Sequence, residues 1–77
     1  MEIHYTRHAL RQMAWRQIVT EEVELLLDDP ASIAPGNEPD TLCYDGVVGG
    51  RGLRAVVADG SDPLRIITVM WRRLPNG

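Results

Sequence analysis

The chain has no lysine, a single cysteine and no long apolar run, and each shortage narrows what it can be. One cysteine, Cys43, excludes an internal disulfide and a zinc site built from several cysteines, and we interpret it as a small strand or core residue. No apolar stretch approaches the roughly 18 residues that a membrane span needs. The N-terminus lacks the basic and apolar regions of a secretory signal. We therefore expect a cytoplasmic protein with no membrane partner.

Charged residues of both signs are present, but they are unevenly placed. Eight basic residues, all arginine, and eleven acidic residues give a net charge of −3. This total opposes strong non-specific binding to nucleic acid. The acidic residues cluster between Glu21 and Asp29, whereas the arginines lie mainly in the first predicted helix and the last two predicted strands. A locally positive face is therefore compatible with the negative total.

The length of 77 residues predicts one small domain over residues 1–77. A chain of this size buries only about 60–65% of the surface that its unfolded form exposes, so its stability is marginal. Additional stabilisation by a bound partner or by formation of a homodimer is compatible with this size.

Hydrophobic periodicity predicts two helices in the first half of the chain. After a short alternating strand at Ile3-His4-Tyr5, Thr6 suits the N-cap of a helix over Arg7–Arg16. At 100° per residue its core face should hold Ala9, Leu10, Met13 and Ala14, and its other face His8, Arg11, Gln12 and Trp15.

The second helix is expected to begin at an N-cap, Thr20, and to end where Asp28-Asp29 meets Pro30, because the residue before proline disfavours helical geometry. Its apolar stripe consists of Val23, Leu26 and Leu27.

The second half of the chain predicts strands separated by turns. Strands are expected over residues 31–37, 41–48, 53–58 and 64–71, with turns at 49–52 and 59–63, and Pro75-Asn76-Gly77 is predicted to be a loose tail. This order predicts an α+β fold, in which an N-terminal helical hairpin packs on a three- to four-stranded antiparallel sheet.

Arg54 lies in the middle of an apolar predicted strand, where a guanidinium needs water, an acid or an anion. If Ala58 pairs with Leu64 across the turn, Arg54 faces Thr68. Both would then share a surface with Val56, Ile66 and Met70. Arg54 is therefore a candidate ligand-binding residue, and the alternative is an exposed arginine on an open sheet face.

His8 is the candidate proton carrier, because histidine titrates near neutral pH. Arg11 and Trp15 share its helix face, and arginine is well shaped to grip a phosphate or carboxylate. The alternatives for His8 are an exposed or capping histidine and a buried one bonded to a carbonyl. His4 and His8 are four residues apart, but Thr6 should begin the helix between them and no third ligand is evident, so we expect no metal site.

Two further features are candidates for RNA contact. Arg72 and its neighbour Arg73 lie at the end of the last predicted strand and could hold a phosphate, or form a solvated terminus. Trp15 and Trp71 are candidates to stack on a base, or to close the edge of the core.

One set of residues spans nearly the whole chain: Tyr5-Thr6-Arg7-His8-Ala9, Met13, Arg16, Ile18, Val23, Pro30, Gly49-Gly50-Arg51, Leu53, Arg54, Val56, Val57 and Ile67-Thr68-Val69. This set resembles a family of small bacterial domains of unknown function, whose pattern opens with His-Ala and continues with Arg-Met and Arg-Gly-Ile. Gln12 stands here for the usual arginine, and Gln17 for the usual glycine. In layout, that family is similar to the RelE-like toxin superfamily, which includes the RelE, ParE, HigB and BrnT types.

The resemblance implies a RelE-like domain acting as the toxin of a toxin–antitoxin or polymorphic toxin system. Many such toxins are metal-independent endoribonucleases, in which the RNA 2′-OH attacks the adjacent phosphate. We therefore expect no cofactor, an RNA substrate such as mRNA or tRNA, and a cognate antitoxin as partner.

In this hypothesis His8 is the general acid or base and Arg54 stabilises the phosphate charge. Arg11, Trp15, Arg72 and Thr68 would contact the RNA. The mechanism requires His8 and Arg54 to converge on one concave surface. The alternative hypothesis is a non-catalytic protein-binding module, including a ParE-like gyrase inhibitor, which docks through its sheet edge or a helix face.

Overall fold

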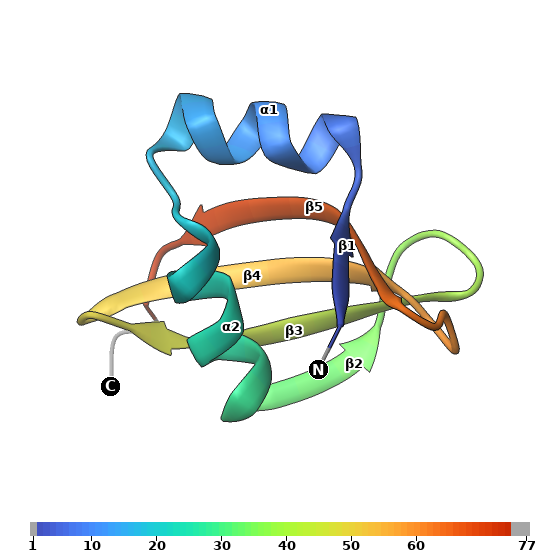
Figure 1. The fold of residues 1–77 in the computed structure, drawn as a ribbon. Helices are drawn as coiled ribbons and strands as arrows, with labels where there is room; N and C mark the ends of the chain where they lie inside the picture. The colour runs from blue at the N-terminus through green and yellow to red at the C-terminus, as the bar shows by residue number, and fades with distance from the viewer. Residues whose placement is uncertain (1, 75–77) are drawn as a thin grey trace.

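The computed structural model describes residues 2–74, which form two helices and five strands (Figure 1). In chain order these are β1 (Ile3–Tyr5), α1 (Arg7–Arg16), α2 (Thr20–Asp28), β2 (Ser32–Pro35), β3 (Thr41–Val48), β4 (Arg51–Ala58) and β5 (Leu64–Arg72). The tail predicted at residues 75–77 lies outside the described residues. Within residues 2–74, neither helix has the length and apolar content to cross a membrane.

All five strands join one sheet in the order β1-β5-β4-β3-β2, with β1 parallel to β5 and the other pairs antiparallel. The α+β class and the position of the helices before the main sheet are confirmed. The expected antiparallel sheet of three to four strands was wrong, because β1 adds a parallel edge strand. Backbone hydrogen bonds from Leu64 to Glu2 and from Thr6 to Ile66 hold β1 there.

Helix α1 begins as its sequence predicts. The Thr6 hydroxyl accepts a hydrogen bond from the Ala9 N–H at 3.1 Å. At the other end Gln17 adopts a left-handed conformation with φ of 58°, and the Ile18 N–H donates to the Met13 carbonyl at 2.8 Å. This pattern is a Schellman motif, which normally favours glycine at the left-handed position.

The buried face of α1 is narrower than the periodicity predicted. Ala9 and Met13 are buried, but Leu10 and Ala14 are exposed, so their assignment to the core was wrong. The helix contacts the sheet chiefly at β5. Leu10 and Ala14 lie roughly 80–120° around the helix axis from the centre of the Ala9–Met13 contact.

Helix α2 is capped one residue earlier than expected. The N-cap is Val19, not Thr20, because the Glu22 carboxylate reaches back and accepts a hydrogen bond from the Val19 N–H at 3.0 Å. The predicted stripe of Val23, Leu26 and Leu27 is buried, as expected.

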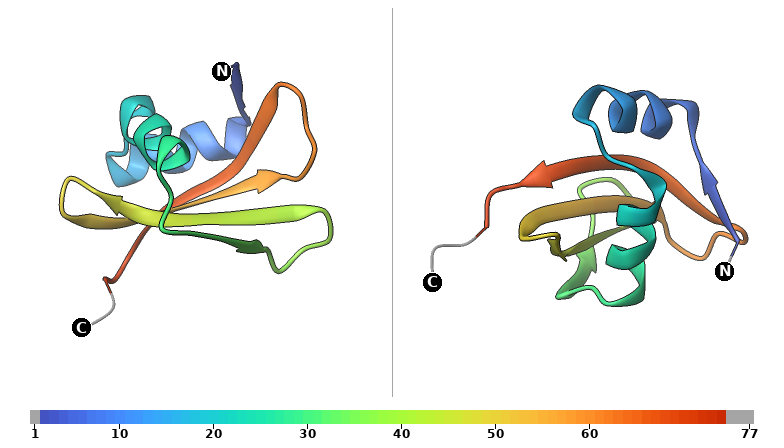
Figure 2. Two further views of the ribbon diagram at one scale, coloured as in Figure 1. Left: turned by 90° about the horizontal axis from the view of Figure 1, so that it is seen from below. Right: turned by 60° about the vertical axis from the view of Figure 1, so that its left-hand side comes forward.

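The core lies between the helices and one face of the sheet (Figure 2). On β4 the buried side chains are Leu53, Ala55 and Val57, whereas Arg54 and Val56 alternate to the other face, which the helices do not cover. We call this second face the open face. Its side chains on the three central strands include Cys43, Asp45, Arg54, Val56, Thr68, Met70 and Arg72.

The predicted register between the last two strands was wrong. Arg54 pairs with Met70, and Val56 pairs with Thr68. A register shift between Val56 and Val57 inserts one extra residue, so Ile66 points into the core while its neighbour Ile67 lines the open face. A β-bulge of this kind reverses which face a residue occupies on one side of the shift.

Candidate functional site

The predicted site residues fall into two groups on opposite sides of the molecule. Arg54, Thr68 and Arg72 lie on the open face. His8, Arg11 and Trp15 lie on the exposed side of α1, which packs on the other face of the sheet (Figure 2). The nuclease mechanism with His8 as acid or base requires His8 and Arg54 to converge on one surface. In the structure they lie on different surfaces.

Arg54 is held by an acidic partner on the neighbouring strand. Its Nε and Nη2 donate to the two carboxylate oxygens of Asp45 at 2.7 and 3.0 Å, which is a bidentate pair. Arg72 contacts the same carboxylate, with Nη1 3.1 Å from Asp45 Oδ2. Two guanidinium groups thus share one carboxylate, and these three side chains together carry one positive charge.

The ion pairs set the protonation state of Asp45. The hydrogen bond from Arg54 lowers the pKa of the Asp45 carboxyl, and the charges of Arg54 and Arg72 lower it further against the opposing effect of burial. The same contact raises the pKa of Arg54. Asp45 is consequently ionised at neutral pH and is a poor proton acceptor.

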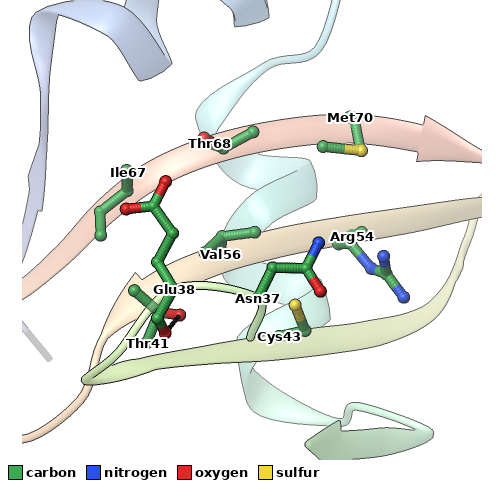
Figure 3. A pocket seen from close by; sticks show the side chains of 9 residues that line it. All are labelled: Asn37, Glu38, Thr41, Cys43, Arg54, Val56, Ile67, Thr68 and Met70. Atoms are coloured by element: carbon green, nitrogen blue, oxygen red, sulfur yellow. Dashed lines mark hydrogen bonds between the residues drawn. The ribbon is translucent and has the colours of Figure 1, made fainter. Parts of the chain in front are cut away.

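A shallow hollow of about 230 Å³ lies on the open face beside Arg54 (Figure 3). Its apolar lining comes from Val56, Ile67 and Met70, together with the Cys43 side chain. Its remaining polar lining consists of Asn37, Glu38, Thr41 and Thr68. Asn37 and Glu38 belong to the loop between β2 and β3, and this loop is held to β3 by the Thr41 hydroxyl, which donates to the Glu38 carbonyl at 2.6 Å.

The solvent-exposed side of α1 carries basic residues and a tryptophan. Trp15 is 81% exposed, and His8 and Arg11 are exposed at positions seven and four residues before it, so the three share one stripe of the helix. Arg7 is also exposed, four residues before Arg11. No acidic residue occurs in α1. We call Arg7, His8, Arg11 and Trp15 the docking face.

The comparison with protein families gives a match to the domain of unknown function DUF4258 over residues 5–71. The chain belongs to this family. Comparison with curated proteins gave no match, and comparison with solved structures also gave none. The matched span begins in β1 and ends in β5, so the DUF4258 match includes the docking face and the open face up to Met70, while Arg72 lies just beyond it.

Trp71 has a structural role in this DUF4258 domain. Its indole N–H donates to the Arg16 carbonyl at 2.9 Å, and the Arg51 guanidinium lies 3.7 Å from its ring centroid. The Arg16 side chain in turn donates to the Val69 carbonyl at 3.0 Å. These contacts tie the end of α1 to β5 and favour the interpretation of Trp71 as a residue that closes the core edge.

Sequence reasoning missed Asp45, although a signal for it was present. Gly49 and Gly50 both have positive φ, 60° and 79°, and form a two-residue turn between Val48 and Arg51. Counting back from that turn places Asp45 opposite Arg54. Among residues 2–74 of the chain, no group of three or more His, Cys, Asp or Glu side chains is arranged to hold a metal ion.

Proposed function

We propose that this DUF4258 domain is a non-catalytic protein-binding module that uses the docking face on α1. The observation that carries the proposal is the 81% exposure of Trp15. Burying a large apolar side chain is worth about 1.5–3 kcal/mol, so an exposed indole is a strong potential anchor for a partner. Tryptophan and arginine are also the residues most enriched in binding hot spots.

The charge around Trp15 indicates the chemistry of the partner. Arg7 and Arg11 place positive charge along one side of the stripe, and α1 has no acidic residue to neutralise it. A complementary surface would offer carboxylates around an apolar pocket for the indole. We therefore propose an acidic protein segment as the partner.

The expected cognate antitoxin would be a protein of this kind. The relation to RelE-like toxins, including ParE-like gyrase inhibitors, is part of this proposal and rests on the sequence resemblance.

Selection of displayed peptides on the immobilised domain tests the docking face. We expect enrichment of peptides that combine Asp or Glu with an apolar anchor, and an affinity that falls as salt rises. Trp15→Ala and Arg11→Glu should each weaken binding of a selected peptide by at least about tenfold. Leu25→Ala is the matched control, because Leu25 is an apolar residue of α2 that is 60% exposed. Equal loss in the control, or peptides insensitive to Trp15→Ala, would refute the proposal.

A metal-independent endoribonuclease is the second candidate, and one observation favours it. Arg54 and Thr68 line the same hollow as Glu38, whose carboxylate extends over it (Figure 3). A guanidinium that stabilises phosphate charge and a carboxylate that accepts the 2′-OH proton are suitable groups for RNA cleavage. In this arrangement Glu38 takes the role that the sequence hypothesis gave to His8.

An RNA cleavage assay in the presence of EDTA separates the two candidates. The nuclease hypothesis predicts cleavage by the wild type that falls by at least about 10²-fold in both Glu38→Gln and Arg54→Ala, with His8→Ala unaffected. The binding-module proposal predicts no cleavage by any of the four proteins.

A further inference from the structure

The hollow on the open face has the form of a small ligand site that the docking face does not explain. Small-ligand sites are mostly apolar, with a few polar groups that fix orientation. Here Val56, Ile67 and Met70 supply the apolar lining and Arg54 is the cationic group. The volume of about 230 Å³ is below the roughly 300–1,000 Å³ of drug-sized pockets, so the guest must be small.

The Arg54 guanidinium has N–H donors left for a second anion. A guanidinium has five N–H donors in a fixed fork, and Asp45 accepts one from Nε and one from Nη2. The edge formed by Nη1 and the second N–H of Nη2 has no protein hydrogen bond among residues 2–74. That edge matches the two oxygens of a carboxylate. Because Asp45 holds the side chain in place, binding there would cost little further side-chain entropy.

The charges around the hollow limit how anionic its guest can be. Arg54, Arg72 and Asp45 together carry one positive charge, and the Glu38 carboxylate brings the formal sum of the four groups to zero. A guest with one negative charge would therefore be held by direct hydrogen bonds to Arg54 and not by a surplus of positive charge. The Glu38 carboxylate, which extends over the same hollow, opposes a guest that carries several negative charges (Figure 3).

These observations distinguish a peptide from a nucleotide. Among the described residues that line the hollow, none is an aromatic side chain on which a base would stack. The net charge of −3 further disfavours a polyanion. We propose that the open-face hollow binds a single carboxylate joined to an apolar side chain, as found at the C-terminus of a peptide. Arg54 holds the carboxylate, and Val56, Ile67 and Met70 contact the side chain.

Methyl NMR of the full chain with N-acetyl-leucine as the probe tests this inference. We expect saturable shifts of the Val56, Ile67 and Met70 methyl signals. N-acetyl-leucinamide, which lacks the carboxylate, should bind at least about tenfold more weakly. Arg54→Lys keeps the charge but removes the planar fork, and should produce a similar loss. Arg65→Lys is the matched control, since Arg65 is exposed on β5 and does not line the hollow.

Several results would overturn the inference. These are the absence of saturable shifts, equal binding of the amide, and tighter binding of uridine 3′-monophosphate than of N-acetyl-leucine, which would indicate a nucleotide site. Thr68→Glu places a second carboxylate in the hollow and leaves the Asp45–Arg54 pair intact. If Arg54→Lys fails to fold, a folded Thr68→Glu variant decides the question, because unchanged binding by it would refute the site. Failure here leaves the docking-face proposal standing, because Trp15 lies on the other side of the molecule.

Discussion

Replacement of Asp45 by asparagine tests the ion-pair network of the open face, and we expect it to lower the free energy of unfolding by about 1.5–3 kcal/mol at pH 7. The carboxylate accepts two hydrogen bonds from Arg54, and the side chains of Asp45 and Arg54 are only 15% and 30% exposed. Hydrogen bonds to charged groups contribute about 1.5–3 kcal/mol. Arg72 is 44% exposed, so its contact should add less than about 1 kcal/mol. Asparagine keeps one acceptor oxygen, which holds the total within the range given.

Urea denaturation measures this loss. With a slope of about 1 kcal/mol per molar urea for a chain of this size, the midpoint should fall by about 1.5–3 M with no change in slope. Asp59→Asn is a suitable control, because Asp59 is an exposed carboxylate in the turn after β4. It should change the free energy by less than about 0.5 kcal/mol.

The pH dependence provides the decisive comparison. The pKa of Asp45 is lower in the folded state than its ordinary value of 3.8. Its contribution to stability is therefore complete above that ordinary pKa and is lost as the pH falls through the folded pKa. The difference between wild type and Asp45→Asn should accordingly be constant from pH 5 to 8 and shrink in more acidic solution. A difference that stays the same down to pH 2, or a neutral Asp45→Asn at pH 7, would refute the assigned role of the network.

Three further substitutions should give distinct results in the same denaturation assay. The buried Tyr5 hydroxyl has no hydrogen-bond partner among residues 2–74, so Tyr5→Phe should be neutral or stabilising by up to about 1 kcal/mol. Burial raises the pKa of Tyr5 above its ordinary value of 10.0, and the charges of Glu24 and Glu21 raise it further. The unfolded state therefore ionises first, and the stability of the wild type should fall relative to that of Tyr5→Phe as the pH rises above 10.0. A loss of more than about 1 kcal/mol in Tyr5→Phe at pH 7 would contradict the assignment. Gln17→Gly should stabilise by about 0.5–1 kcal/mol, because it relieves the left-handed conformation at φ of 58°, and destabilisation would argue against that geometry. Gly52→Ala should cost about 1–3 kcal/mol, since its Cβ would lie 2.5 Å from the Arg72 carbonyl oxygen, and a neutral effect would place the β4–β5 pairing in error.

The predictable part of the fold is the part that local sequence controls. Thr6 capped its helix as expected, and the Val23, Leu26 and Leu27 stripe of α2 is buried. Gly49 and Gly50 turn the chain at the expected place, because both residues adopt positive φ at little steric cost. The predicted turn over residues 49–52 was too long, since β4 already begins at Arg51. Each of these features depends on residues within one or two turns of chain.

The errors arose where distant segments meet. The parallel pairing of β1 with β5 joins residues about sixty positions apart, and no local pattern reports it. The register shift at Val56/Val57 likewise depends on how β5 lies against β4 and β1 together. As a result Ile66, which was predicted to lie on the surface around Arg54, is buried in the core, and Ile67 lies on that surface in its place.

The separation of His8 from Arg54 follows from two periodicities that were already visible in the sequence. Ala9 and Met13 turn one side of α1 toward the core, which leaves His8 outward. Leu53 and Ala55 turn one side of β4 toward the same core, which leaves Arg54 on the opposite side of its strand. When a helix layer packs on a single sheet, the non-core sides of the two layers point in opposite directions. A histidine and an arginine that both lie away from the core, one in each layer, can therefore share a pocket only at an edge of the sheet. Arg54 is on β4, the central strand of five, so the two groups serve two separate surfaces.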